Sequence, residues 1–214
     1  MRHNPDTVLS DDDVVKGVIR RNPWATMISH GDDGLVASHY PFLLDETAED
    51  IVLLSHVGRP DEELHQLGTR EVLVVFEGPN GYVSPSWYGT SPAVPTWNFV
   101  AVHCHGTPEL MDTDTNLDVL ERLVDYFEAP LPEPFRLRRD AENSDYADRL
   151  VSGTVGFSLR VERYEAKDKM SQDKPPEVVE RVIEALRQPG PHHNPPLAER
   201  MAAHQRLRPL SEDT

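Results

Sequence analysis

Six short segments rich in β-branched and aromatic residues recur along this chain, separated by turn residues. Such segments are typical of strands, and they occur at residues 24–29, 35–44, 51–55, 71–76, 94–110 and 155–164. The turn Asp32-Asp33-Gly34 predicts a hairpin between the first two. We therefore expect a mainly β (α+β) fold, a β-barrel with peripheral helices. The pattern alone does not separate the possible barrels.

Fewer helical patterns lie between these strands. Ser10 precedes three aspartates and an apolar face, which predicts a helix that ends before Pro23. One long helix is expected up to Phe127, capped by Thr113 or Asp114. Residues 60–67 predict a brief helix, residues 78–85 a turn-rich segment, residues 129–140 a loop and residues 146–150 a helical turn.

The composition changes beyond Pro175. Residues 178–186 predict an amphipathic helix, and residues 189–196 hold four prolines and are expected to be irregular. Residues 197–207 predict a last short helix, or a segment that folds only against a partner. We therefore expect a barrel domain of residues 1–174 and a helical, proline-rich C-terminal extension of residues 175–214.

The formal net charge of −16 is spread over the chain and disfavours direct binding to nucleic acid, because the overall field repels phosphate. Arg136, Arg138 and Arg139 could form a local basic patch or a solvated loop. The single cysteine, Cys104, forms no intrachain disulfide. No apolar run reaches the about 20 residues that a membrane helix needs, and Met1 begins no secretory signal pattern. These features predict a cytoplasmic protein.

Residues 77–88 form an unusual aromatic segment. Two glycines and two prolines restrict the backbone around Tyr82, Trp87 and Tyr88. Such a segment can present aromatic faces and hydroxyls to a planar ligand. It could equally be a surface loop whose aromatic side chains cover the barrel.

The segment 94–106 combines hydrogen-bonding and aromatic residues on one strand. Thr96 and Asn98 project to one face of that strand and Trp97 to the other, so one face suits a polar ring edge or a phosphate. His103 and His105 also share a face. No third ligand lies nearby in sequence, whereas zinc takes three or four, so no metal site is predicted.

Two further segments could bind a phosphate, which needs a cation and short donors. Residues 165–172 follow the last predicted strand and offer Lys169 with Ser171, although they could be an ordinary charged strand end. Arg59 lies between a predicted strand end and a helix start, where it could also grip a phosphate. The chain has no Gly-x-Gly-x-x-Gly pattern, no P-loop and no helix-turn-helix with a basic recognition helix.

Taken in order, several motifs resemble the PaiB family of FMN-binding negative transcriptional regulators. The central ones are Tyr-Val-Ser-Pro-Ser-Trp-Tyr at 82–88 and Val-Pro-Thr-Trp-Asn at 94–98, preceded by the run at 72–79. His-Tyr-Pro at 39–41 and Lys-Asp-Lys-Met-Ser-Gln at 167–172 are similar to an early and a closing motif of the family. The similarity extends over about residues 8–187.

The resemblance implies a split β-barrel of the FMN-binding type that assembles as a homodimer, with FMN at the subunit interface. It also implies negative regulation of transcription. The residues expected to bind FMN are His56, Arg59, Ser84, Ser86, Trp87, Thr96, Trp97, Asn98, Lys169, Ser171 and Gln172. Within this set, the phosphate is expected at Arg59 and at Lys169 with Ser171, and the ring near Trp97 and Asn98.

Two alternatives to an FMN-binding regulator stay open from the sequence. Split barrels often use FMN to carry hydride, so the chain could be an FMN-dependent oxidoreductase of an unknown small substrate. No catalytic acid or base can be named. Pro60 and Asp61 also depart from the family pattern after Arg59, so the barrel could have lost its ligand and serve only as an interaction module.

Overall fold

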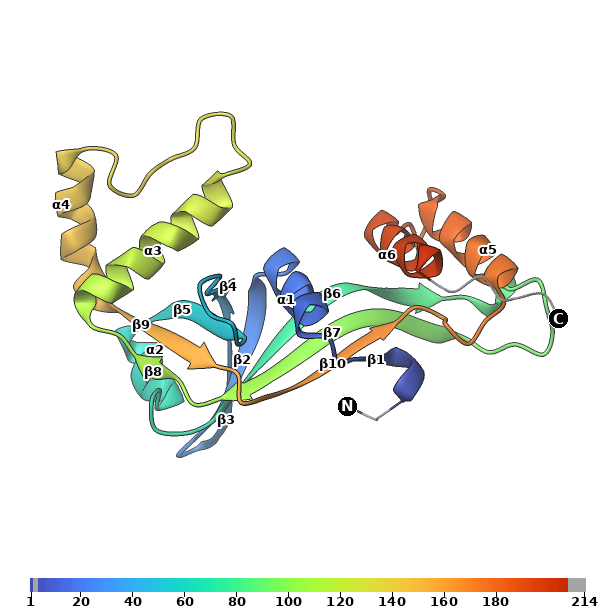
Figure 1. Cartoon of the computed structure of the whole chain (residues 1–214), viewed down its shortest axis with the longest axis horizontal. Coiled ribbons are helices and arrows are strands. Elements are labelled where there is room, and N and C mark those ends of the chain that lie inside the picture. Colours follow the sequence, from blue (N-terminus) through green and yellow to red (C-terminus); the bar gives the residue numbers. More distant parts are fainter. Residues whose placement is uncertain (2–3, 208–214) are drawn as a thin grey trace. The chain divides into compact units, whose positions relative to one another are not determined.

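The computed structural model of the chain describes residues 1 and 4–207. Within these residues the strands are β1 Val8–Leu9, β2 Trp24–Gly31, β3 Gly34–Pro41, β4 Leu43–Leu44, β5 Val52–Gly58, β6 Val72–Val83, β7 Thr96–Gly106, β8 Glu109–Leu110, β9 Thr154–Arg160 and β10 Arg163–Lys169. The α-helices are α1 Asp12–Arg21, α2 Arg59–His65, α3 Thr113–Glu128, α4 Ala141–Leu150, α5 Pro176–Arg187 and α6 Pro195–Arg206 (Figure 1).

The strands form two sheets. The larger sheet has the order β1-β10-β7-β6-β2-β3 and the smaller one β4-β5-β9-β8. Strands β2 and β3 pair from Trp24 opposite Pro41 to Gly31 opposite Gly34, which confirms the predicted hairpin. Gly34 has φ +120°, a conformation that glycine adopts without the strain of a side chain.

The chain divides into two compact units. Unit 1 contains residues 1–11, 77–102 and 165–214, and unit 2 contains residues 12–76 and 103–164. The boundaries fall inside or beside strands β6, β7 and β10. The predicted division at residue 174 stays a prediction. Two short ranges lie outside the described residues. Residues 208–214 belong to the predicted C-terminal extension, and residues 2–3 belong to the N-terminal segment for which no secretory signal is predicted.

Unit 2 has an aromatic core between its strands. The rings of Phe42 and Phe76 lie 5.8 Å apart, and those of Phe42 and Phe157 lie 5.9 Å apart, both edge to face. All three side chains are almost fully buried. Edge-to-face packing adds about 0.5–1.5 kcal/mol per pair to the burial of the rings, so these phenylalanines are a main source of stability in this unit.

The helix caps differ from the prediction. Asp112, not Thr113 or Asp114, caps α3 by accepting a hydrogen bond of 2.8 Å from the Thr115 amide. Asp140 does the same for α4, from the Asn143 amide at 2.8 Å, so the predicted helical turn at 146–150 is a longer helix. Aspartate is among the best N-cap residues because its carboxylate satisfies a free helical amide.

Two strands continue where turns or strand ends are predicted. Strand β6 runs through residues 78–83, and Gly81 fits there because a Cβ atom would lie 2.8 Å from Asn194 Nδ2. The missing side chain thus permits a close approach rather than a turn. The predicted final strand at 155–164 is two strands, β9 and β10, and β10 continues to Lys169.

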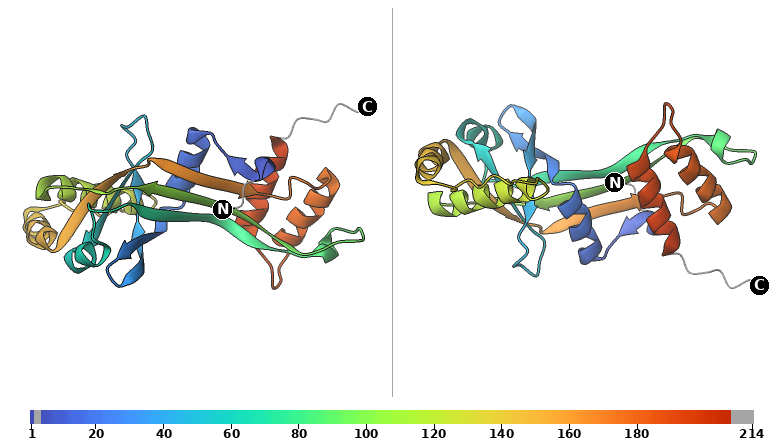
Figure 2. Two further views of the ribbon diagram at one scale, coloured as in Figure 1. Left: turned by 90° about the horizontal axis from the view of Figure 1, so that it is seen from below. Right: turned by 90° about the horizontal axis from the view of Figure 1, so that it is seen from above.

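In unit 1, helix α6 lies across β6, β7 and β10 beside α5 (Figure 2). Leu197, Ala198 and Met201 on its inner face are fully buried. The helix begins at Pro195, within the segment predicted to be irregular. Asn194 caps it, and proline is tolerated in a first turn because the amide there needs no helical partner. Among the described residues, none of the helices combines the length and the apolar character needed to cross a membrane.

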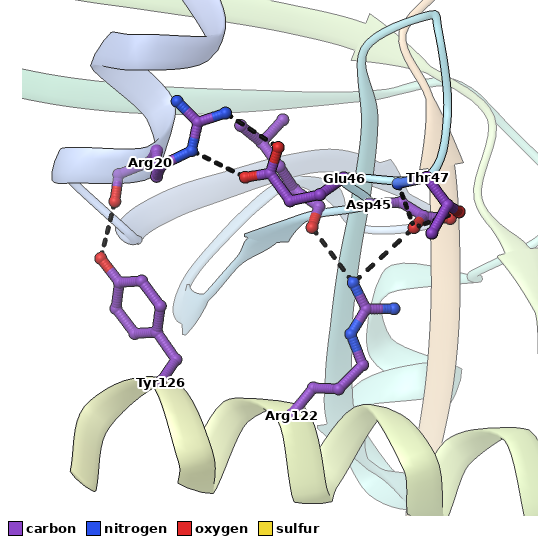
Figure 3. Close-up of polar contacts among 7 residues, drawn as sticks. Arg20, Asp45, Glu46, Thr47, Arg122 and Tyr126 are labelled. Atoms are coloured by element: carbon purple, nitrogen blue, oxygen red, sulfur yellow. Dashed lines mark hydrogen bonds and ion pairs between the residues drawn. The ribbon is translucent and has the colours of Figure 1, made fainter. Parts of the chain in front are cut away.

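A polar cluster in unit 2 joins α1 and α3 to the segment after β4 (Figure 3). Arg20 donates two hydrogen bonds to the Glu46 carboxylate, at 2.7 and 2.8 Å, and the Tyr126 hydroxyl donates to the Arg20 carbonyl at 2.6 Å. Arg122 lies 3.7 Å from Asp45 and donates to the Leu44 carbonyl at 3.3 Å. Every arginine of this cluster therefore already has an acidic partner.

This cluster gives a pH-dependent prediction. The hydrogen bond from Arg20 holds the pKa of Glu46 below its ordinary value, so the pair stabilises the fold above the ordinary pKa and loses this effect as the pH falls through the lowered one. Both side chains are about half exposed, so we expect Arg20→Ala to cost only about 0.5–1 kcal/mol at neutral pH. Urea unfolding at neutral pH and at about pH 3 measures the difference. Arg21→Ala is the control, and an equal cost at both pH values would contradict the prediction.

Candidate functional site

A cavity of about 620 Å³ in unit 1 gathers residues from both ends of the chain and its middle. We call it the Lys169 cavity. It is lined by Asn4, Asp6, Thr7, Tyr88, Thr90, Pro92, Ala93, Val94, Pro95, Thr96, Lys169, Ser171, Gln172, Asp173, Lys174, Pro175, Glu177 and Val178. Its size falls in the range of about 300–1,000 Å³ that is common for small-molecule sites.

Lys169 provides the positive charge of this cavity. Its ammonium donates a hydrogen bond to the Thr96 hydroxyl, from the end of β10 to the start of β7. Burial lowers the pKa of Lys169, and the charges of Lys167 and Lys174 lower it further, while Asp173 opposes them. Among the described residues no carboxylate lies within ion-pair distance of Lys169, so its charge is available to a ligand.

The turn after β10 is held in an unusual conformation. Ser171 has φ +61°, in the left-handed region that residues other than glycine seldom adopt. Its hydroxyl lies 3.0 Å from the Nδ2 atom of the fully buried Asn98. Gln172 accepts from the Met170 amide at 2.6 Å and donates to the Asp6 carbonyl at 3.2 Å. These contacts fix Ser171 at the cavity wall and place Asn98 behind it.

Tyr88 carries an unsatisfied hydroxyl at this cavity. The residue is 4% exposed, and its hydroxyl oxygen is buried with no partner among the described residues. Burial raises the pKa of this phenol, while Lys174 opposes that effect. Arg181 of α5 fixes the residue by donating to the Tyr88 carbonyl at 3.1 Å. A buried hydroxyl without a partner costs free energy, so it marks a place for a hydrogen-bonding ligand.

The Lys169 cavity has the donors that a phosphate monoester requires. The ammonium of Lys169 and the hydroxyls of Thr96, Ser171 and Tyr88 supply a cation and short donors. Lys174 adds a second ammonium, which is paired with Asp173 at 2.8 Å. The carboxylates of Asp6, Asp173 and Glu177 also line the cavity.

The other residues predicted from the aromatic segments lie outside this cavity. Ser84 caps the short turn Pro85–Trp87 and lies 2.7 Å from the Ser86 hydroxyl. Trp87 contacts His192, with 5.9 Å between the ring centroids. Trp97 is 55% exposed and lines a different cavity.

His56 and Arg59 belong to unit 2. The Nδ1 atom of His56 is buried without a partner among the described residues, and burial lowers the pKa of this side chain. Arg59 donates to the Ser152 carbonyl at 2.6 Å and lies 3.4 Å from Glu62. Asp61 accepts a hydrogen bond of 2.6 Å from the Tyr40 hydroxyl.

Four predicted site residues thus meet in one cavity: Thr96, Lys169, Ser171 and Gln172. Lys174 is not among the residues predicted from the sequence, and Tyr88 is named there only as part of the aromatic segment. His105 of β7 has an acidic neighbour, since its Nδ1 atom lies 3.5 Å from Glu71. In the part of the chain that the structure describes, no group of three or more histidine, cysteine, aspartate or glutamate residues could hold a metal ion.

The fold is shared with solved flavoproteins. The flavocytochrome Anf3 from Azotobacter vinelandii is 17% identical, with a TM-score of 0.55 over 76% of this chain and 69% of that one. The FAD and heme binding protein from Mycobacterium smegmatis is also 17% identical, with a TM-score of 0.57 over 81% of this chain and 78% of that one. These similarities show the fold, and they confirm a mainly β (α+β) split β-barrel with peripheral helices.

Residues 1–163 match the family described as "Putative FMN-binding domain", and the chain belongs to this FMN-binding family. This family match confirms FMN as the predicted cofactor of this class of FMN-binding proteins. "Protease synthase and sporulation protein PAI 2" from Bacillus subtilis (strain 168) is 28% identical over 170 residues, which cover 78% of this chain and 80% of that protein. The predicted resemblance to PaiB is therefore confirmed as a distant homology.

Proposed function

We propose that this chain is a cytoplasmic, homodimeric FMN-binding protein of the PaiB type that acts as a negative regulator of transcription. Membership of the FMN-binding family and the homology to PAI 2 support the proposal. The name of that relative connects it with protease synthesis and sporulation. The observation that carries the binding part is the Lys169 cavity, which is lined by Lys169, without an acidic partner among the described residues, and by Tyr88, whose buried hydroxyl has no partner there.

In this proposal the FMN phosphate is held by Lys169, Thr96 and Ser171, with Tyr88 as a further donor. Gln172 positions the turn that carries Ser171. The apolar side chains Val94, Pro95 and Val178 line the same cavity and suit a ring system. Bound FMN would supply a redox-active isoalloxazine ring.

The homodimer gives a role to the predicted residues of unit 2. The family resemblance implies FMN at a subunit interface, so we assign His56 and Arg59 to the part of the site completed by dimerisation. The unpartnered Nδ1 of His56 supports this assignment, because a buried imidazole nitrogen without a hydrogen bond is unfavourable. Arg59 would have to exchange its bond to the Ser152 carbonyl for the phosphate.

Regulation is proposed to act through a protein partner rather than by direct contact with DNA. The net charge of −16 repels DNA. The candidate basic patch is neutralised within the chain. Arg138 lies 2.7 Å from Glu121 and 2.9 Å from Asp148, Arg139 lies 3.0 Å from Asp140, and Arg136 pairs with Asp125.

The test combines an absorption spectrum with the mass in solution. We expect the purified protein, supplied with FMN, to show the bands of bound oxidised flavin and to elute as a dimer. A promoter-fragment gel shift at low salt is expected to show no complex with the protein alone. A colourless monomer would overturn the binding proposal. If the FMN-loaded protein consumes NADPH, the oxidoreductase alternative is supported instead of the regulatory function.

A further inference from the structure

A second cavity of about 600 Å³ lies within unit 1, and its chemistry differs from that of the Lys169 cavity. We call it the aromatic cavity. It is lined by Gly81, Tyr82, Trp97, Leu186, Pro191, His192, His193 and Asn194. None of these eight residues is a lysine, arginine, aspartate or glutamate, although such residues make up 27% of the chain. The lining therefore favours an uncharged ligand over an anion, since it offers no lysine or arginine to neutralise a negative charge.

Aromatic rings form its walls. The centroids of Tyr82 and His192 lie 5.2 Å apart, and those of Tyr82 and Trp97 lie 6.5 Å apart with the rings edge to face. Trp97 is 55% exposed, so a large part of its indole surface is uncovered. Among the described residues, neither the Tyr82 hydroxyl nor the His192 ring has a hydrogen-bond partner. A planar ligand can therefore both stack on a ring and form a directed hydrogen bond.

The wall that carries His192 is held in place before any ligand binds. Asn194 donates from its side chain to the Asn80 carbonyl at 2.8 Å and from its backbone amide to the Leu186 carbonyl at 2.8 Å. The His193 ring lies 3.1 Å from the Gln188 carbonyl. A preformed wall lowers the entropic cost of binding. His192, His193 and Asn194 follow the part of the chain that matches the FMN-binding family, which ends at residue 163.

The aromatic cavity is separate from the Lys169 cavity. Thr96 lines one and Trp97 the other, and successive side chains of a strand point to opposite faces. One ligand cannot reach both through the paired strand β7, which has β10 and β6 as its neighbours. A compound in the aromatic cavity would thus be a second ligand.

We propose that the aromatic cavity is a binding site for an uncharged planar aromatic compound of one or two fused rings. The compound stacks on Trp97 and exchanges a hydrogen bond with Tyr82 or His192. The proposal gives Trp97 a role other than the predicted contact with the flavin ring, and it does not depend on the proposed regulatory function.

Quinoline, which is uncharged near neutral pH, is the probe for this site. Its binding to the FMN-loaded protein is followed by the NMR signals of quinoline itself and of the indole N–H groups, so that variants without one tryptophan can also be measured. We expect a saturable shift of the Trp97 signal, and affinity lower by about tenfold for His192→Ala and for Trp97→Leu. Quinoline-4-carboxylate has the same ring system with a negative charge, and we expect it to bind at least about tenfold more weakly.

Trp24 provides a matched control, because it is also exposed and stacks on a histidine, His39, at 6.3 Å. Trp24→Leu should leave quinoline affinity unchanged. Equal shifts of the Trp24 and Trp97 signals would reduce the effect to general binding on exposed indoles and overturn the proposal. If quinoline-4-carboxylate binds as tightly as quinoline, the lining does not favour an uncharged ligand, and the proposal is overturned. Competition between quinoline and FMN would show that the cavity holds the flavin ring, and would overturn the separate site.

Discussion

Replacing Lys169 with methionine is expected to weaken FMN binding by about 10- to 100-fold, the largest effect on ligand binding that the structure predicts. A hydrogen bond to a charged group contributes about 1.5–3 kcal/mol, and Lys169 has no carboxylate partner to share its charge within the described residues. Methionine preserves the length and apolar character of the side chain, so the cavity wall stays filled. Flavin fluorescence during titration of the apoprotein measures the affinity.

Lys167→Met is the matched control, since this residue lies two positions earlier on the same strand and outside the cavity lining. It removes the same charge, so similar losses in both variants would reduce the effect to net charge and contradict the phosphate assignment. Arg59→Ala, compared with Arg139→Ala, tests the residue of unit 2 separately. A loss of FMN only for Arg59→Ala would place the phosphate there instead.

The same lysine determines the pH dependence of binding. Its pKa in the free protein is lowered, chiefly by burial, and phosphate binding requires the protonated form. FMN affinity should therefore fall as the pH rises through this lowered pKa, before an ordinary lysine would titrate. Lys169→Arg should move that decline to higher pH, because the guanidinium stays protonated.

Replacing Arg200 with methionine is expected to cause the largest loss of stability, about 3 kcal/mol. Arg200 of α6 pairs with Asp168 of β10, whose side chain is 4% exposed. Removing the arginine leaves a buried carboxylate without its counter-charge, which costs about 3–5 kcal/mol when the pair is fully buried. The partial exposure of Arg200, 24%, places the effect at the lower end. For a chain of this size it corresponds to roughly 6–12 °C in Tm.

Two further variants show why Arg200→Met loses stability, and the free energy of unfolding of each is measured by thermal and urea unfolding. Arg206→Met removes an exposed arginine from the same helix and should change stability by less than about 0.5 kcal/mol. Adding Asp168→Asn to Arg200→Met should recover much of the loss, because no buried charge is left. If the double variant is as unstable as Arg200→Met, packing of the arginine stem and not the unpaired charge supports α6.

The local patterns of the sequence predicted most elements of the fold but not their contacts. The β2–β3 hairpin, α1 and α3 follow from turn residues and apolar periodicity, which act within a few residues, although the cap of α3 was predicted one or two residues too late. Strand β6 was predicted to end early because Gly78 and Gly81 are typical of turns. The fold uses Gly81 to admit Asn194 of the α6 cap, more than a hundred residues away, and no local pattern encodes that approach.

The candidate site shows the same limit. Thr96, Lys169, Ser171 and Gln172 were selected by motif, and the structure brings them to one cavity. Tyr88 is defined only by burial without a partner, which depends on Arg181 and on α5. His192 lies in a proline-rich loop without periodicity, so nothing in the sequence indicated that it faces Tyr82. Likewise the bond between Arg59 and the Ser152 carbonyl joins positions with no sequence relation.

The Lys169 cavity is lined by residues from the ranges 4–7, 88–96 and 169–178. The ribosome therefore synthesises its first lining segment early and its last one late. A nascent chain that has not yet reached Lys169 lacks that lysine, the Ser171 turn and the wall formed by α5, however well its earlier strands have folded. If FMN binds in this cavity as proposed, it can be captured only after residues 169–178 have been synthesised. Products that stop before Lys169 are then expected to stay colourless.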